Sequence, residues 1–380
     1  MAKLRLGMVG GGQGAFIGGV HRIASRIDNH YNLVAGSLAS NADIAHISAK
    51  ELGINDDRSY ATFQDMAEKE SLREDGIDVV SIVTPNYLHY PIAEAFLSKN
   101  IHVICDKPLT HNLEDAEKFL ESVKKSKALF ALTHNYTGYP MVRQAREMFR
   151  NGEIGNLRVI QVEYAQDWLT LPIENEGQKQ ASWRTDPSKA GMGGSIGDIG
   201  SHAFNLVDFI TGAKLNELCA DISSFVPGRK NDDNAHVLLR YENNVKGMLW
   251  SSQVAPGNEN ALRIRIYGDK GGMEWEQENP NYLTFDIFGK AKKIIRRAGN
   301  ETIDISNRIT RIPPGHPEGY LEGFANIYSD FAKQILAFKD NQKPEKDILL
   351  VPSIEDGVKG VKFITTVVES GSNGGKWIKV

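Results

Sequence analysis

The sequence predicts an α/β Rossmann domain with a parallel, doubly wound sheet, followed by an α+β domain with a mostly antiparallel open sheet. Three observations lead to this fold class. Strand and helix patterns alternate through the first third of the chain, a glycine-rich loop follows the first strand, and strand-like segments joined by short turns dominate after Tyr136. Alternating strands and helices are typical of βαβ units. We expect a first domain over residues 1–135 and a second over residues 136–380.

The first domain is expected to hold strands and helices in alternation. Strands are predicted over residues 4–9, 31–38, 79–83, 102–105 and 129–133, and helices over 17–27, 42–52, 91–99 and 113–123. The strand at 79–83 is almost entirely apolar, which is typical of a strand covered on both faces.

The second domain changes to strands that read as an antiparallel sheet. A helix at 141–150 precedes strands at 157–168, 219–226, 236–241, 245–254, 263–267 and 282–287, with helices at 196–210, 318–338 and 354–369 and a last short strand. Turns containing Asn or Gly, such as Glu242-Asn243-Asn244 and residues 269–272, join several strands. Such turns favour antiparallel pairing.

Composition excludes several classes of protein. The chain has 380 residues, a formal net charge of -4 and 41% hydrophobic residues, without the basic excess expected of nucleic-acid binding. No run approaches the ~18 apolar residues of a membrane span, and no room precedes the first strand for a signal peptide. Cys105 and Cys219 form no disulfide or metal pattern. We expect a cytoplasmic protein that binds neither nucleic acid nor membrane.

The glycine-rich loop predicts a dinucleotide site. The first strand runs into Gly10-Gly11-Gly12-Gln13-Gly14-Ala15-Phe16-Ile17-Gly18, at the point where a helix begins. Glycine allows close backbone approach to a pyrophosphate, and the helix N-terminus offers free N–H groups. The third glycine of the usual fingerprint is replaced by Ala15, or Gly18 serves in a longer loop. Cofactor contacts are expected from Gly10, Gly12, Gln13, Gly14, Ala15, Phe16 and Ile17.

The end of the second strand leaves the choice of coenzyme open. An acidic residue there would favour NAD, but the sequence continues through Ser37, Ser40 and Asn41. Ser37 and Ser40 are expected to reach a ribose hydroxyl or a 2′-phosphate, so the cofactor is predicted as NAD or NADP. The alternative is a plain turn in which Ser40 or Asn41 caps the next helix.

Three further motifs follow in order along the chain. They are Thr84-Pro85-Asn86-Tyr87-Leu88-His89, Asp106-Lys107-Pro108 and Gly197-Asp198-Ile199-Gly200-Ser201-His202. Together with the glycine-rich loop, they make the whole chain resemble the glucose–fructose oxidoreductase/inositol dehydrogenase/MocA family. The resemblance implies further cofactor contacts from Thr84, Pro85, Asn86, His89, Asp106 and Lys107, and a catalytic set of Lys107, Asp198 and His202.

The family resemblance also implies an activity and an assembly. Most such proteins transfer a hydride between a nicotinamide and a secondary alcohol or ketone of a sugar or cyclic polyol, and their open sheet often forms an oligomer interface. We therefore expect a small-molecule substrate and a homodimer or homotetramer formed through the C-terminal sheet. Asp106 departs from the usual Glu of the family, which keeps the charge but shortens its reach.

Residue chemistry agrees with these roles. Lys107 follows a parallel strand, where ligands bind in such sheets. A histidine has the pKa nearest neutrality for a general base, and Asp198 and His202 share a helix face at a spacing of four. Alternatives are a solvated surface pair, or a metal pair for which spacing suggests no third ligand. No metal is expected.

Other side chains are candidates for a substrate pocket that suits a sugar, because aromatic faces and polar groups occur together. They are Tyr136, Trp168, Arg184 and His316, besides Lys107, Asp198 and His202. Each of the four also has a purely structural interpretation. Two other functions stay open: a glycoside hydrolase that oxidises its substrate transiently with NAD, and a non-catalytic NAD(P)-sensing protein.

Overall fold

The computed structural model describes residues 3–380, which form two compact units. The first unit runs to Asn135 and also takes in Tyr320–Val358. The second consists of Tyr136–Gly319 and Lys359–Val380. The predicted division assigned all of 136–380 to one domain, so the structure differs in where it places Tyr320–Val358.

The first unit is built on a parallel sheet. Its strands are β1 (Leu4–Gly10), β2 (Tyr31–Ser37), β3 (Val79–Val83), β4 (His102–Cys105) and β5 (Phe130–Leu132). They lie in the order β2-β1-β3-β4-β5, and every neighbouring pair is parallel. All five residues of β3 are buried, as its apolar sequence predicts. The parallel sheet confirms the predicted Rossmann class.

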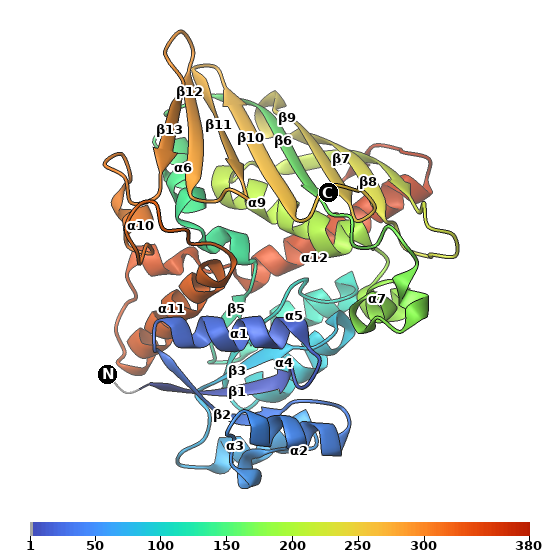
Figure 1. Ribbon diagram of the computed structural model, residues 1–380, viewed down its shortest axis with the longest axis vertical. Helices are drawn as coiled ribbons and strands as arrows, with labels where there is room; N and C mark the ends of the chain where they lie inside the picture. Colours follow the sequence, from blue (N-terminus) through green and yellow to red (C-terminus); the bar gives the residue numbers. More distant parts are fainter. Residues whose placement is uncertain (1–2) are drawn as a thin grey trace. The chain divides into compact units, whose positions relative to one another are not determined.

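Helices flank this sheet, and all but the last of them fall between its strands in the sequence (Figure 1). They are α1 (Phe16–Ile27), α2 (Ala42–Glu51), α3 (Phe63–Leu72), α4 (His89–Leu97), α5 (Leu113–Lys125) and α11 (Tyr320–Lys339). The side chains of Asn41, Thr62 and Asn112 each cap a helix by accepting from the backbone N–H three residues later. Helix α3 was not predicted.

Helix α11 completes the core of the first unit although it lies late in the sequence. Phe324, Tyr328, Phe331 and Ile335 form one buried stripe at helical spacing. This stripe belongs to the same hydrophobic cluster as residues of α1, β1, β3 and β4. A domain boundary drawn from sequence order cannot detect such a return of the chain, which explains the difference from the predicted division.

The second unit carries a nine-stranded sheet. Its strands are β6 (Leu157–Ala165), β7 (Leu215–Ser223), β8 (Asn234–Tyr241), β9 (Lys246–Ser252), β10 (Ala261–Gly268), β11 (Gly271–Glu276), β12 (Tyr282–Ile287), β13 (Lys293–Arg296) and β14 (Ile378–Lys379). The order is β13-β12-β11-β10-β6-β9-β8-β7-β14. Only the β6–β9 pair is parallel among these described strands, so the sheet is mostly antiparallel, as predicted.

Strands β11 and β13 were missed by the sequence analysis. The Gly271-Gly272 pair was interpreted as a turn, whereas β11 begins at Gly271. A Cβ atom at Gly271 would lie 2.1 Å from the carbonyl oxygen of Asp286 in β12. Glycine therefore opens this strand because the neighbouring backbone approaches it closely.

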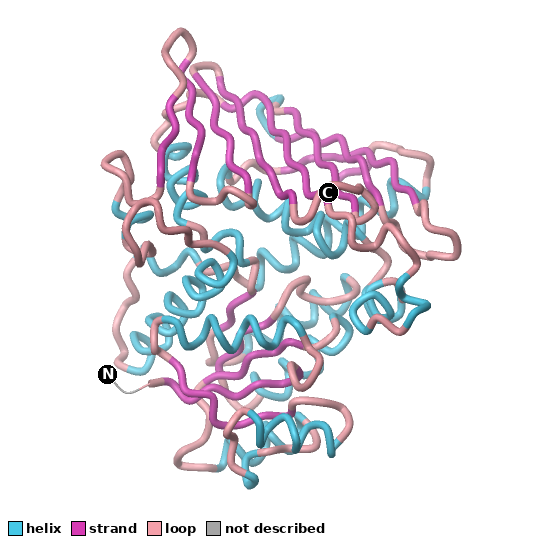
Figure 2. Tube along the Cα trace, viewed as in Figure 1, coloured by secondary structure: helices cyan, strands magenta, loops and turns pink. Residues whose placement is uncertain are grey.

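One face of the large sheet is covered by helices (Figure 2). The helices of this unit are α6 (Pro140–Arg150), α7 (Lys179–Arg184), α8 (Pro187–Ala190), α9 (Ser201–Thr211), α10 (Asp304–Asn307) and most of α12 (Ile354–Ser372). Helices α6 and α9 pack on the sheet, and the described chain places no helix on its other face (Figure 1). Leu238 and Met248, which are paired across β8 and β9, are 48% and 50% exposed there.

Because α11 packs into the core of the first unit, we expect two of its phenylalanines to differ in their contribution to stability. Phe331 is fully buried, whereas Phe338 is 45% exposed. We expect Phe331→Ala to lower the free energy of unfolding by about 3–5 kcal/mol through loss of packing. Phe338→Ala should change it by about 0.5 kcal/mol, as is usual at a surface site. Denaturant unfolding measures both; equal losses in the two variants would contradict the assignment.

Candidate active site

The glycine-rich loop joins β1 to α1 with a backbone that only glycine adopts easily. Gly10, Gly11 and Gly14 have φ of +81°, +76° and +72°. Helix α1 begins at Phe16, and the side chain of its N-cap residue, Ala15, forms no capping hydrogen bond. Its first N–H groups therefore point to the loop end without a side-chain cap, which is the arrangement that binds phosphate.

Gly18 serves as the third glycine of the fingerprint. A Cβ atom at Gly18 would lie 2.3 Å from Cα of Gly11, so α1 touches the loop backbone directly. The backbone at Ala15 is extended, with φ of -95°, so this position does not need glycine. The longer-loop alternative of the sequence analysis is the one observed.

Gly12 packs against the residue that follows β2 and against helix α2. Its N–H donates to the Leu38 carbonyl at 3.0 Å, and a Cβ atom there would lie 2.7 Å from the same oxygen and 2.8 Å from Oγ of Ser48. Glycine at this position is thus required by packing against the end of β2, whatever ligand the loop holds.

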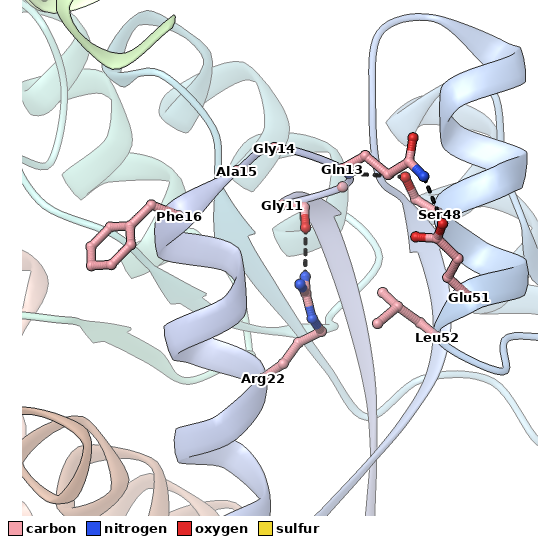
Figure 3. A pocket seen from close by; sticks show the side chains of 10 residues that line it. Gly11, Gln13, Gly14, Ala15, Phe16, Arg22, Ser48, Glu51 and Leu52 are labelled. Carbon is pink, nitrogen blue, oxygen red and sulfur yellow. Dashed lines mark hydrogen bonds between the residues drawn. The ribbon is translucent and has the colours of Figure 1, made fainter. Parts of the chain in front are cut away.

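A pocket of about 400 Å³ borders the loop (Figure 3). Its lining is Gly11, Gly12, Gln13, Gly14, Ala15, Phe16, Arg22, Ser48, Glu51 and Leu52. Gln13 is fixed by two bonds, from its N–H to Ser48 Oγ at 3.0 Å and from its amide to Glu51 at 2.6 Å. Arg22 donates to the Gly11 carbonyl at 2.5 Å. Sequence reasoning missed Arg22, Ser48 and Glu51, because helical polar residues carry no motif.

The remaining predicted cofactor residues follow the carboxyl ends of neighbouring strands. Ser37 ends β2, Thr84-Pro85-Asn86 follows β3 and Asp106-Lys107 follows β4. These strands are parallel, so their carboxyl ends share one edge of the sheet, where ligands bind in such folds. Ser37 is buried and Ser40 exposed, while Asn41 is engaged as the cap of α2.

His89 contacts the segments that follow β3 and β4. Its ring is fully buried, with Nε2 2.9 Å from the Thr84 carbonyl oxygen and Nδ1 2.9 Å from that of Pro108. Burial lowers the pKa of His89. The side chain therefore supports the segment that carries Lys107, and its predicted contact with the cofactor stays a prediction.

Asp106 is a partly buried carboxylate next to Lys107 in the chain, with 13% of its side chain exposed. Burial opposes its ionisation, but the His21 ring, the Lys107 ammonium and His89 together lower the pKa of Asp106 to about 2. Thr133 also donates to it at 2.9 Å. Close to the pair, burial and the Lys107 charge lower the pKa of His134 to about 3. The neighbours of Asp106 thus favour its ionised form beside Lys107.

In the second unit, Asp198 lies in a widened, π-helical turn, Ile196–Gly200, that leads into α9. The predicted helix at 196–210 is thus a π-turn followed by an α-helix. Such turns occur frequently at functional sites. Asp232, which is nearly buried, anchors the turn by accepting from the N–H groups of Gly194 at 2.6 Å and Ile196 at 2.8 Å.

The Asp198 carboxylate is held from two sides. Its Oδ2 accepts from Arg184 Nε at 3.2 Å and from the Gln253 amide at 2.9 Å. Arg184 in turn stacks over Trp183, with its guanidinium carbon 4.4 Å from the ring centre. The structure therefore brings the predicted residues Arg184 and Asp198 together. Gln253 was missed, since it follows a strand without any local signal.

His202 in α9 sits against two tyrosines. It is 6% exposed, and its ring centre lies 4.8 Å from that of Tyr136 and 6.2 Å from that of Tyr164. The two tyrosine hydroxyls are 2.5 Å apart, and burial raises the pKa of Tyr136 to about 12. Tyr136 is therefore a neutral hydrogen-bonding group at the side of the histidine.

A polar network extends from these tyrosines to Trp168. Tyr164 donates to Asn260 Oδ1 at 2.7 Å, and the Gln166 amide donates to the same oxygen at 2.7 Å. Trp168 donates to Gln166 at 3.1 Å. The predicted residues Tyr136 and Trp168 thus belong to one network, whose connecting residues come from two strands that are far apart in sequence.

His316 lies on a separate loop of this unit. Its side chain is exposed, while its carbonyl accepts from Arg297. Arg297 is almost fully buried, donates to the Ile312 carbonyl at 2.8 Å and pairs with Glu318 at 2.7 Å. These bonds hold the Pro/Gly loop in place, and the His316 side chain is exposed on it.

Comparisons with known proteins place the chain in a family. Residues 4–148 match the profile described as the oxidoreductase family with an NAD-binding Rossmann fold, and residues 142–274 match the GFO/IDH/MocA C-terminal domain. An uncharacterized oxidoreductase of Bacillus subtilis, YfiI, is 35% identical, with 99% of this chain and 96% of that protein covered.

The chain belongs to the GFO/IDH/MocA family of oxidoreductases.

Solved structures of GFO/IDH/MocA-like proteins share the whole fold. An oxidoreductase from Sinorhizobium meliloti is 51% identical with a TM-score of 0.91, covering 100% of both chains. An inositol dehydrogenase homolog from Azotobacter vinelandii, solved with NADH and myo-inositol, is 32% identical with a TM-score of 0.92, covering 100% of this chain and 98% of that one.

Membership in the GFO/IDH/MocA family confirms the resemblance, the fold class, the oxidoreductase activity and the nicotinamide dinucleotide expected from the sequence. The loop fits that cofactor, because α1 touches Gly11 and lacks a side-chain cap. None of the helices formed by residues 3–380 is both long and apolar enough to cross a bilayer. Neither cysteine is in a disulfide.

The close contact of Gly18 with Gly11 predicts a sharp difference between two adjacent glycines. Gly18→Ala should push α1 off the loop at a cost of about 1–3 kcal/mol and weaken NAD⁺ binding by about tenfold. Gly19→Ala is the matched control, because the nearest atom to its Cβ would be 3.9 Å away. Calorimetric titration of folded variants measures the affinity; equal affinities for the two would show that the contact does not shape the site.

Proposed function

We propose that this chain oxidises or reduces a secondary alcohol or ketone of a sugar or cyclic polyol, with Lys107, Asp198 and His202 as its catalytic residues. The observation that carries the proposal is His202, a buried histidine packed against two tyrosines, on the helix that follows the Asp198 turn. The relative solved with NADH and myo-inositol supports this substrate class.

The cofactor side of the proposal uses the strand ends of the first unit. Gly10, Gly12, Gln13, Gly14, Ala15, Phe16 and Ile17 would hold the pyrophosphate, Ser37 and Ser40 the adenosine ribose, and Thr84, Pro85, Asn86, His89, Asp106 and Lys107 the nicotinamide half. The bound nicotinamide accepts or delivers the hydride. Support comes from the shared edge of the parallel strands and the uncapped start of α1.

The catalytic side follows from the chemistry of the groups. His202 would take the hydroxyl proton, since a histidine can exchange protons near neutral pH. Lys107 would donate a hydrogen bond to the reacting oxygen and stabilise negative charge there. Asp198, held by Arg184 and Gln253, would accept from a second hydroxyl of the substrate.

Substrate selection would involve aromatic and polar groups of the second unit. Tyr136, Trp168, Arg184 and His316 are the proposed contacts, besides Lys107, Asp198 and His202. The Tyr136–Tyr164–Asn260 network offers hydroxyl and amide groups with fixed directions. Such groups suit a ligand with several hydroxyls.

Assembly and location complete the proposal. We propose a homodimer or homotetramer formed through the helix-free face of the large sheet, where Val159, Leu238, Met248, Tyr267 and Ile294 are exposed. Apolar patches of this kind mark association surfaces. We also propose a cytoplasmic location, for which the two free cysteines are support.

Substrate class can be tested by a screen. Inositols, monosaccharides and glycosides are incubated with NAD⁺ and NADP⁺, and the absorbance of the reduced nicotinamide is followed. A polyol or sugar dehydrogenase gives stoichiometric reduced cofactor. Glycoside cleavage without net reduction would assign the hydrolase alternative, and tight cofactor binding without any turnover would favour a sensor.

The catalytic roles predict separate losses. His202→Ala should lower turnover by about 10²–10⁴-fold with cofactor affinity nearly unchanged, and Lys107→Met should lose both turnover and substrate affinity. His236→Ala, on strand β8 beside Trp250, is the control histidine. Turnover, cofactor affinity and thermal midpoint are measured on one preparation. Near-normal turnover of His202→Ala would move the base elsewhere, with His316 as the next candidate.

Coenzyme preference should respond at Ala39. Leu38 is buried in the core with Met8 and Ile54, so a charge there would unfold the loop, whereas Ala39 is partly exposed. Ala39→Asp should raise the ratio of NAD to NADP activity, because a carboxylate accepts from a ribose hydroxyl and repels a 2′-phosphate. The ratio of kcat/KM values measures this; an unchanged ratio would show that the ribose lies elsewhere.

A further inference from the structure

A cluster of polar side chains is buried behind Asp106 in the first unit. Ser81 lies in the middle of β3, His21 in α1 and Tyr328 in α11, and all three are at most 1% exposed. Each contributes polar atoms to an otherwise apolar core. Burying such groups costs free energy unless they bond one another.

The three side chains form a closed triangle. His21 Nδ1 is 2.8 Å from the Tyr328 hydroxyl and 3.3 Å from the Ser81 hydroxyl, and the two hydroxyls are 2.8 Å apart. This arrangement fixes the plane of the imidazole and occupies Nδ1. The other ring nitrogen is thereby aimed in one direction.

That direction is Asp106. His21 Nε2 lies 3.7 Å from Oδ1 of Asp106, which is an ion-pair distance rather than a hydrogen bond, and the same oxygen accepts from Thr133 at 2.9 Å. The carboxylate is thus contacted by His21 of α1 and by Thr133, which follows β5. Lys107 is its neighbour in the chain, and the Asp106 charge acts on the Lys107 ammonium.

We propose that His21, oriented by Ser81 and Tyr328, is a positioning residue that fixes the Asp106 carboxylate and through it the amine of Lys107. Because His21 lies in the helix that starts at the glycine-rich loop, the network also connects the cofactor-binding helix to the lysine. The functional part of this inference rests on the proposed role of Lys107 in catalysis.

The groups around Asp106 determine the pKa of its carboxyl. They are His21 from α1, His89 from α4, Thr133 and His134 from the end of β5, and Lys107 itself. Burial alone raises the pKa of a carboxyl, so the low pKa of Asp106 depends on these partners. Removal of His21 should therefore raise the pKa of Asp106.

The first experiment follows the Asp106 carboxyl directly and needs no substrate. The protein is labelled with ¹³C at aspartate carboxyls, and Asp106→Asn identifies the signal. In the wild-type protein the signal should stay that of a carboxylate down to the lowest pH at which the protein is folded. In His21→Leu it should titrate at or above the ordinary value of about 3.9. His21→Gln keeps a donor near the Nε2 position and should restore the low value.

The second experiment measures turnover, with myo-inositol or the polyol found by the screen. His21→Leu should lower kcat by about tenfold with KM for NAD⁺ little changed, and adding it to Asp106→Asn should cause no further loss. Tyr328→Phe, which keeps the ring, should lose part of kcat. Tyr31→Phe is the matched control, because the Tyr31 hydroxyl donates to the Tyr328 backbone carbonyl at 2.8 Å and not to the side-chain triangle.

Three results would each overturn the inference. The first is an Asp106 carboxyl that titrates at the same pH in His21→Leu as in the wild type. The second is a double variant whose losses multiply, and the third is a Tyr31→Phe loss equal to that of Tyr328→Phe, since a purely structural role predicts both. Normal turnover of Lys107→Met would instead refute the proposed function, while the carboxyl titration would still decide the network.

Discussion

The contact between Gly18 and Gly11 is the constraint on which the first unit depends. It lets α1 approach the loop so closely that no side chain fits between them. The same approach sets where the uncapped N–H groups of α1 point and where His21, one turn later, meets the core. The proposed phosphate site of the loop and the position of His21 therefore both depend on one backbone contact.

In the second unit, a carboxylate fixes the backbone of the turn that carries Asp198. Asp232 accepts from the N–H groups of Gly194, before the π-turn, and Ile196, its first residue, and the Asp198 carboxylate is held by Arg184 and Gln253. Asp232 lies just before β8 and Gln253 directly follows β9, so the large sheet supports the short turn through residues at its strand ends. Functional groups built on rigid elements keep their geometry better than groups on free loops.

Much of this could be predicted because it is encoded locally. The apolar strand at 79–83 and the glycine-rich loop each specify their own conformation, and the strand ends of a parallel sheet share one edge by topology. The return of α11 to the first core could not be predicted, since Phe331 meets residues more than 200 positions away. Asn260 and Gln253 were missed for the same reason: a polar residue near a strand end acquires its partners only in the folded sheet.

The proposed reaction moves a hydride between a polyol carbon and a nicotinamide. It is tested most directly with polyols and sugars deuterated at carbon, incubated with NAD⁺ or NADP⁺, and mass analysis of the reduced cofactor. The account predicts a reduced nicotinamide that carries one deuterium, formed together with an equal amount of ketone. Release of a cleaved glycoside without any labelled reduced cofactor, or no reduced cofactor from any member of the set, would contradict it.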